Sequence, residues 1–239
     1  MNVLAIGNSF SEDATRYLHG IARADGESLA VTNLYIGGCS LERHYRNMLS
    51  GESAYALQSN GHKTGFSVSL REALLNRRWD VVTLQQVSHQ AFDAESYMPY
   101  ITALADFVRT YSPKAKIYLH QTWAYEEGSE RLFDVAKYDS ADKMLSDVVK
   151  ANSKIADLIG AERIIRSGEL FLALSKKGIE KIHRDTFHAS LGVGRYALGL
   201  LWYRTLTGRS VSENRFCDFD EAISDIEIQL IKEAVDRFD

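Results

Sequence analysis

Short apolar segments alternate with longer amphipathic segments along most of the chain. Runs of apolar or β-branched residues that are short enough for buried strands occur at residues 3–6, 29–35, 80–84, 116–120 and 162–165. Helical periodicity is clearest at residues 97–111, 140–158, 190–207 and 220–238. Strands that alternate with helices are typical of parallel βαβ units, in which helices cover both faces of the sheet. The pattern predicts an α/β fold, a three-layer α/β/α sandwich on a mainly parallel five-stranded sheet.

A single domain over residues 1–239 accommodates this pattern. The length of 239 residues fits one large α/β domain, and the chain has no internal repeat and no low-complexity tract. Residues 41–65 are polar and rich in turn-forming residues, and we interpret them as an excursion from the domain rather than as a linker.

Composition excludes several classes of protein. A hydrophobic content of 45% and a charged content of 25% are typical of soluble globular proteins. The net charge is −4 and no basic stripe is present, so we expect no nucleic-acid partner. The two cysteines, Cys39 and Cys217, are too few for a disulfide framework and lack the close spacing of zinc ligands.

The sequence contains neither a candidate membrane span nor a signal-peptide pattern. No apolar run approaches the ~18 residues that span a bilayer, and the N-terminus shows no signal-peptide pattern. We therefore expect no membrane partner and a cytoplasmic protein as given, or a secreted or periplasmic one if a signal peptide was removed. No oligomeric state follows from the sequence.

Polar residues follow the first four predicted strands, where open parallel sheets gather their functional groups. In chain order these segments are Gly7-Asn8-Ser9-Phe10-Ser11, Gly37-Gly38-Cys39-Ser40, Gln85-Gln86-Val87-Ser88-His89 and Gln121-Thr122-Trp123.

Ser9 is the candidate nucleophile. It follows an apolar strand and a glycine, and it precedes a helix that we expect from Glu12 to Arg23. The backbone N–H of Ser9 would lie near the positive end of that helix, where it can stabilise an oxyanion. The alternative is that Ser9 or Ser11 only caps the helix.

Asp185 and His188 are the candidate partners of Ser9. A serine hydroxyl needs a base to take its proton and a third group to orient that base. Three residues apart on a turn, Asp185 and His188 can supply both. Alternatively, Asp185 is a turn residue and His188 a polar residue at a helix entrance. A metal site with His183 is disfavoured, because residues two apart point differently and no further cluster completes the ligand set.

Two of these segments resemble the motifs of SGNH (GDSL-like) hydrolases. Gly7-Asn8-Ser9-Phe10 is similar to the Gly-Asp-Ser-Leu signature, with Asn8 in place of Asp and Phe10 in place of Leu. Asp185-Thr186-Phe187-His188 is similar to the Asp-x-x-His element of that family. The resemblance extends from residue 7 to residue 188. It implies a flavodoxin-like strand order with the first strand central, Ser9 as nucleophile, His188 as general base, Asp185 as its orienting group, and no cofactor.

The resemblance also implies three donors to the oxyanion. They are the N–H of Ser9, a glycine N–H after the second strand, which alignment from Asn33 places at Gly38, and an asparagine side chain after the third strand. The Gly-x-Asn-Asp of the family is missing there. We expect Gln86 to replace the asparagine, with Gln85 as the close alternative and His89 as the residue that strict counting selects. A glutamine-based third element is similar to that of a divergent bacterial branch, DUF4886-like.

The resulting prediction is a serine esterase that hydrolyses small acyl esters through a Ser-His-Asp triad and an acyl-enzyme. O-acetylated carbohydrates are a substrate class suggested by the resemblance, and Trp123 and Tyr125 could stack on a sugar ring unless they pack in the core. The alternative is a catalytically silent α/β module that binds a carbohydrate or another small ligand. A flavodoxin-like nucleotide binder is disfavoured, because the first loop lacks a Gly-x-Gly-x-x-Gly or Lys-Ser/Thr phosphate cradle.

Overall fold

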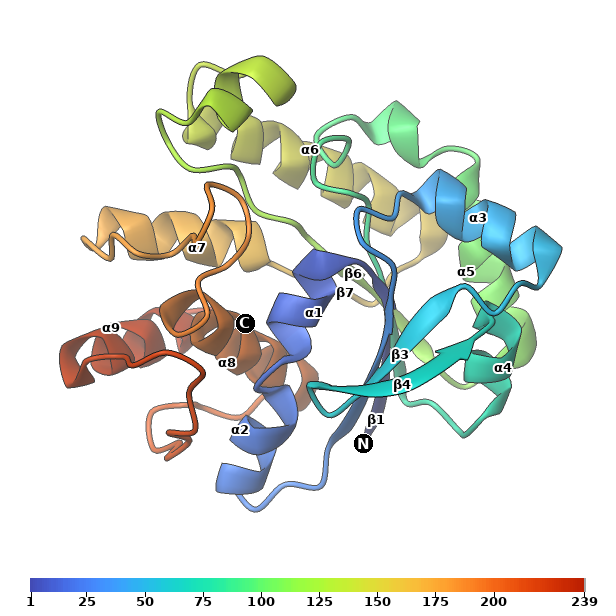
Figure 1. Cartoon of the computed structure of the whole chain (residues 1–239), viewed down its shortest axis with the longest axis horizontal. Coiled ribbons are helices and arrows are strands. Elements are labelled where there is room, and N and C mark those ends of the chain that lie inside the picture. Colours follow the sequence, from blue (N-terminus) through green and yellow to red (C-terminus); the bar gives the residue numbers. More distant parts are fainter. Residues whose placement is uncertain (239) are drawn as a thin grey trace.

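A seven-stranded sheet divides the molecule in the computed structural model, which describes residues 1–238 (Figure 1). The strand order is β4-β3-β2-β1-β5-β6-β7, and β2, β1, β5, β6 and β7 run parallel. The parallel strands are β1 Asn2–Gly7, β2 Ala30–Tyr35, β5 Val81–Leu84, β6 Lys116–His120 and β7 Arg163–Ile165. All five predicted strands are thus present, and the flavodoxin-like order with the first strand central is confirmed.

Two further strands extend the sheet beyond the predicted five. They are β3 Tyr55–Ser59 and β4 His62–Val68, an antiparallel hairpin that pairs with β2. Its two turn residues, Asn60 and Gly61, both have positive φ, as Asn-Gly hairpin turns require. Because β4 lies at the edge of the sheet and is largely exposed, it carries no apolar run, and residues 41–65 give no strand-like pattern.

Helices cover both faces of the sheet (Figure 1). On one face lie α1 Ser9–Thr15, α2 Leu18–Ala24, α7 Ser167–Lys176, α8 Val193–Thr207 and α9 Asp225–Val235. On the other lie α3 Leu41–Ser50, α4 Leu70–Leu75, α5 Tyr100–Tyr111 and α6 Ala141–Ile159. Two single turns, η1 Ala94–Tyr97 and η2 Arg131–Val135, lie in the connections. The predicted three-layer α/β/α architecture is confirmed. No helix within residues 1–238 has both the length and the apolar character needed to cross a membrane.

The central strand separates two hydrophobic cores. Val3 and Ala5 of β1 belong to the core under α1, α2 and α8, whereas Leu4 and Ile6 belong to the core under α4 and α5. This alternation follows from the two-residue period of a strand. Since both faces of β1 are buried, its sequence shows a continuous apolar run rather than an alternating one.

The first helix differs from its prediction. In place of one helix from Glu12 to Arg23, the chain forms α1 and α2 with a break between them, and α1 begins at Ser9. It begins there because the side chain of Asn8 accepts a hydrogen bond from the N–H of Phe10 and caps the helix. The earlier start places Ser9 at the first helical position, two residues beyond the end of β1.

Candidate active site

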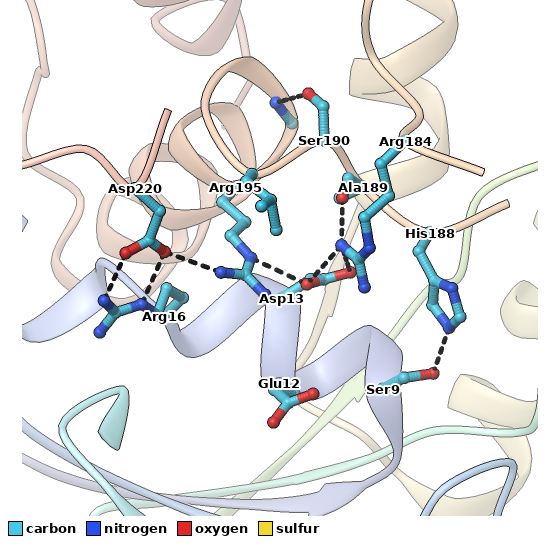
Figure 2. A network of polar contacts seen from close by, with 12 residues as sticks. Ser9, Glu12, Asp13, Arg16, Arg184, His188, Ala189, Ser190, Arg195 and Asp220 are labelled. Atoms are coloured by element: carbon cyan, nitrogen blue, oxygen red, sulfur yellow. Dashed lines mark hydrogen bonds and ion pairs between the residues drawn. The ribbon is translucent and has the colours of Figure 1, made fainter. Parts of the chain in front are cut away.

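Ser9, His188 and Asp185 form a continuous line of hydrogen bonds, although 179 residues separate the first two along the chain. Ser9 Oγ lies 2.9 Å from Nε2 of His188, and Nδ1 of His188 lies 2.8 Å from Oδ2 of Asp185 (Figure 2 shows Ser9 and His188). A carboxylate oxygen can only accept, so Nδ1 carries the proton and Nε2 accepts the hydrogen of the Ser9 hydroxyl. This is the arrangement in which an imidazole takes a proton from serine.

Asp185 holds His188 in two ways. Its Oδ1 accepts the backbone N–H of His188 at 2.8 Å, and its Oδ2 bonds the imidazole. Partial burial raises the pKa of Asp185, but the hydrogen bonds from His188 outweigh burial and hold that pKa below its usual range. Asp185 is therefore ionised at neutral pH and fixes both the position and the tautomer of the imidazole.

Ser9 is not the residue that caps α1. Asn8 occupies the N-cap, and the hydroxyl of Ser11 is turned to Asn33 and to the carbonyl of Asn8. As the first helical residue, Ser9 keeps a backbone N–H without a partner inside the helix. The hydroxyl of Ser9 is thus free to pair with His188, and its N–H is not used by the helix.

Asn8 joins the loops that follow three parallel strands. Its Nδ2 donates to the carbonyl of Cys39 after β2, at 3.0 Å, and its Oδ1 accepts from Nε2 of Gln85 after β5, at 2.8 Å. The side-chain oxygen of Gln85, Oε1, accepts a hydrogen bond from Nδ1 of His120, and Nε2 of His120 faces the hydroxyl of Ser167. Burial lowers the pKa of His120 to about 3, so its imidazole is neutral. The buried network fixes the backbone on either side of Ser9 and Gly38.

A cavity of about 290 Å³ opens over these groups. It is lined by Asn8, Ser9, Phe10, Tyr35, Gly37, Gly38, Val87, Ser88, His89, Arg131, Phe187 and His188. Gly38 has a φ of 60°, a conformation that favours glycine, and lies on the exposed turn after β2. Ser9 and Gly38, the first two predicted oxyanion donors, therefore face one cavity.

Gln86, the predicted third oxyanion donor, does not line the cavity of Ser9. The amide nitrogen of Gln86 donates to the carbonyl and to the hydroxyl of Ser96, which uses both of its hydrogens. The amide nitrogen of Gln85 donates to the side-chain oxygen of Asn8, and neither glutamine lines the cavity. Of the three candidates, His89 alone lines it. Gln86 thus holds the loop after β5 against residue 96 rather than facing Ser9.

Trp123 and Tyr125 are buried, with 0% and 1% of their surface exposed, and so present no face to a sugar ring. Trp123 stacks on Phe10 with ring centroids 4.1 Å apart, and its indole N–H donates to the carbonyl of Phe187 at 2.7 Å. The Tyr125 hydroxyl pairs with that of Ser88. The expectation of a stacking platform is corrected: both rings are core residues that support the walls of the cavity from beneath.

A buried ion network connects the helix of Ser9 with the loop of His188 (Figure 2). Asp13, on α1, is fully buried and lies 2.9 Å from Nη1 of Arg184 and 2.9 Å from Nε of Arg195. Arg184 directly precedes Asp185 and also donates to the carbonyl of Ala189. Burial raises the pKa of Asp13 and the two guanidinium groups oppose this rise. The network ties both ends of residues 184–189 to α1.

His183 belongs to a different cavity, of about 460 Å³, which includes none of Ser9, Asp185 and His188. Burial lowers the pKa of His183 to about 4. Within residues 1–238, no group of three or more histidine, cysteine, aspartate or glutamate side chains is arranged to hold a metal ion. The structure therefore does not bring His183, Asp185 and His188 together as ligands.

Sequence reasoning missed Asp13, Arg131, Arg184 and His120. Asp13 and Arg184 are 171 residues apart, and a pair of charged residues at such a distance leaves no local pattern. His120 ends a predicted strand, at the edge of the sheet where open parallel sheets gather functional groups, which is a signal that could have selected it.

Solved structures with this fold include several hydrolases. A candidate SGNH hydrolase from Slackia heliotrinireducens is 22% identical, with a TM-score of 0.63, over 86% of this chain and 98% of that chain. Axe2, an acetylxylan esterase from Geobacillus stearothermophilus, is 13% identical, with a TM-score of 0.56, over 90% of this chain and 97% of that chain. The fold is that of the SGNH, or GDSL-like, hydrolases.

A narrower assignment follows from the sequence. The profile of the domain of unknown function DUF4886 matches residues 2–237, and the chain belongs to this family. A DUF4886 family protein from Bacteroides uniformis is 34% identical, with a TM-score of 0.92, over 99% of this chain and 93% of that chain. No curated protein matches the sequence.

Proposed function

We propose that this protein is a serine esterase in which Ser9 is the nucleophile, His188 the general base and Asp185 the group that orients the base. The observation that carries the proposal is the unbroken line from Ser9 Oγ to Nε2 of His188, at 2.9 Å, and on to Asp185, at 2.8 Å. A serine that only capped a helix would not need an imidazole paired with a carboxylate at its hydroxyl. The similarity of the fold to hydrolases of the SGNH type supports the same reading.

The reaction proceeds in two steps. Ser9 Oγ attacks the carbonyl carbon of the ester while His188 takes the hydroxyl proton, and the tetrahedral intermediate collapses as His188 protonates the departing alcohol. Water then attacks the acyl-enzyme, again giving its proton to His188, and Ser9 recovers its proton as the acid leaves. Asp185 stays ionised and stabilises the imidazolium in both steps.

The oxyanion that forms in each step needs donors already in place. The N–H groups of Ser9 and Gly38 are the first two, and the first turn of α1 adds its positive field. His89 is our candidate for the third, because it lines the cavity while the amides of Gln85 and Gln86 are used elsewhere.

The substrates are esters of small acyl groups. A cavity of about 290 Å³ holds a short acyl chain and part of an alcohol, and acetylated carbohydrates are the first natural class to test. Because Trp123 and Tyr125 are buried, any sugar would have to contact the rim of the cavity.

Hydrolysis of para-nitrophenyl acetate tests the proposal. We expect measurable turnover that falls by about a thousandfold or more in Ser9→Ala and in His188→Ala, because each variant breaks the proton transfer. A fluorophosphonate probe separates an enzyme from a silent binding module. It should label Ser9 in the native protein and in the control Ser11→Ala, which removes a buried serine of the same helix turn. Unaltered turnover in Ser9→Ala, or no labelling at Ser9, would contradict the proposal.

A further inference from the structure

Arg131 is the one permanently charged residue among those that line the cavity of Ser9. It is the first residue of η2, in the connection between β6 and α6. No aspartate or glutamate lines this cavity. The cavity therefore presents a positive charge next to the proposed nucleophile, with no acidic side chain in its wall to offset it.

The guanidinium group is held in place by rings rather than by an acid. Its central carbon lies 3.7 Å from the ring centroid of Phe187 and 5.7 Å from that of Tyr125. The ring centroid of Phe187 lies 3.8 Å from that of His188. Phe187 therefore contacts both the guanidinium group of Arg131 and the imidazole of His188, the proposed base. None of the ion pairs formed within residues 1–238 includes Arg131. Arg184 and Arg195, by contrast, are both paired with the carboxylate of Asp13.

The charge of Arg131 acts inside the cavity. Partial burial lowers the pKa of His89, which lines the same cavity, and the positive charge of Arg131 lowers it further. A neutral His89 leaves Arg131 as the fixed cation of the wall. Arg131 also forms a hydrogen bond with the hydroxyl of Tyr125. A guanidinium group carries five N–H donors, so further donors remain for a ligand.

We propose that Arg131 binds a carboxylate of the substrate, so that the site takes esters that also carry a carboxylate group. A planar guanidinium donates two parallel hydrogen bonds to a carboxylate, and one cation balances one negative charge. The hydrolytic part of this inference rests on the esterase function proposed above. The binding part rests on the cavity alone.

Two pairs of matched esters test the inference. Monoethyl glutarate and ethyl pentanoate differ by a carboxylate on the acyl side, and para-acetoxybenzoate and para-acetoxybenzamide differ by one on the alcohol side. In at least one pair we expect kcat/KM of the native protein to favour the charged ester by about tenfold or more. That ratio should fall to near one in Arg131→Gln and should decrease as ionic strength rises. The pair that shows it identifies the side on which the carboxylate binds.

Arg71→Gln is the matched control, because Arg71 also lies over an aromatic ring, that of Tyr111, but on α4 at the far face of the sheet. It should keep the ratio of the native protein. An equal loss on both members of each pair in Arg131→Gln would show that Arg131 only packs against Phe187, and would overturn the inference. So would a native preference for the neutral esters.

A binding measurement keeps the inference independent of turnover. In Ser9→Ala, titration with glutarate or benzoate should shift the NMR signals of Gly37 and Gly38. The dissociation constant obtained from these shifts should rise at least tenfold in the double variant that also carries Arg131→Gln. If the native protein hydrolyses no ester, the esterase proposal fails while this titration still decides the role of Arg131. If neither carboxylate shifts these signals, the inference that Arg131 binds a carboxylate is overturned.

Discussion

The amide of Asn8 makes a contact that a carboxylate at this position would not make. Its Nδ2 donates to the carbonyl of Cys39, and its Oδ1 accepts from Gln85 and from the N–H of Phe10. In Asn8→Asp an acceptor oxygen would face the Cys39 carbonyl in a buried site. We expect a loss of about 1–3 kcal/mol in the free energy of unfolding and a lower kcat, because Ser9 and Gly38 flank the broken contact.

Urea unfolding and turnover of para-nitrophenyl acetate measure both effects of Asn8→Asp. Asn76→Asp, which makes the same change at an exposed asparagine, is the control and should shift the free energy of unfolding by less than about 0.5 kcal/mol. If Asn8→Asp behaves like the control, the Asn8 amide does not position the nucleophile loop.

Gln85 and Gln86 show what a single sequence cannot decide at the level of the residue. Ser9, Asp185 and His188 can be selected because their residue types, spacing and strand-end position carry a chemical requirement. The two glutamines lie in an irregular segment after β5, where the strand alternation that would fix the direction of each side chain has ended. Gln85 turns to Asn8 and Gln86 to Ser96, which no pattern indicates.

At the level of elements, the position of the His188 loop against α1 depends on Asp13. Arg184→Gln removes the contact from the loop, and Arg195→Gln removes a contact to the same carboxylate from α8. Both should lose about 1–3 kcal/mol in the free energy of unfolding, since each weakens the pairing of a buried carboxylate. Only Arg184→Gln should also lose about tenfold in kcat, because misplacing the base slows proton transfer. Equal kcat losses in the two variants would contradict a specific role of the loop contact.

Asp220 connects the segment before α9 to the end of α1 and to α8, through Arg16 at the C-cap of α1 and Arg195 on α8, in contacts that Figure 2 shows. The hydrogen bond from Arg16 is the main cause that lowers the pKa of Asp220 to about 2. A lowered pKa means that the carboxylate stabilises the fold above its ordinary pKa of 3.8 and that this stability is lost as the pH falls toward about 2. In Asp220→Asn the free energy of unfolding should be lower than in the native protein at pH 7, and the difference should shrink between these two pKa values. A difference independent of pH would contradict an ionic contribution.

Element boundaries were predictable where a local signal exists and not elsewhere. The apolar runs of β1, β5 and β6 indicate buried parallel strands, because both faces of these strands are covered. The exposed edge strand β4 carries no such signal, and only Asn60-Gly61 marks the hairpin.

Across the whole molecule, strand order brings the site together. With β1 between β2 and β5, the loops that follow these three strands meet at one edge of the sheet, and α8 packs on α1 so that residues 184–189 reach it. Alternating periodicity indicates such a sheet but not which side chains become core and which line the cavity. Trp123 is an example, because an aromatic residue after a strand can serve either purpose.

The two cores of the molecule allow a test of that distinction. Trp123 lies in the core under α1, and Trp79 lies in the core on the other face of the sheet. Each donates its indole N–H to a backbone carbonyl, that of Phe187 for Trp123 and that of Ala73 for Trp79. Replacing either with phenylalanine removes that bond and leaves space, so both variants should lose about 1–3 kcal/mol in the free energy of unfolding.

Only Trp123→Phe should also lower kcat, because Trp123 stacks on Phe10, next to Ser9, and holds Phe187, next to His188. KM should stay close to the native value, since the buried ring does not contact substrate. Trp79→Phe should keep the native kcat despite an equal loss of stability, which separates a local effect on the site from general destabilisation. A raised KM with unchanged stability in Trp123→Phe would instead show that the indole is a substrate platform.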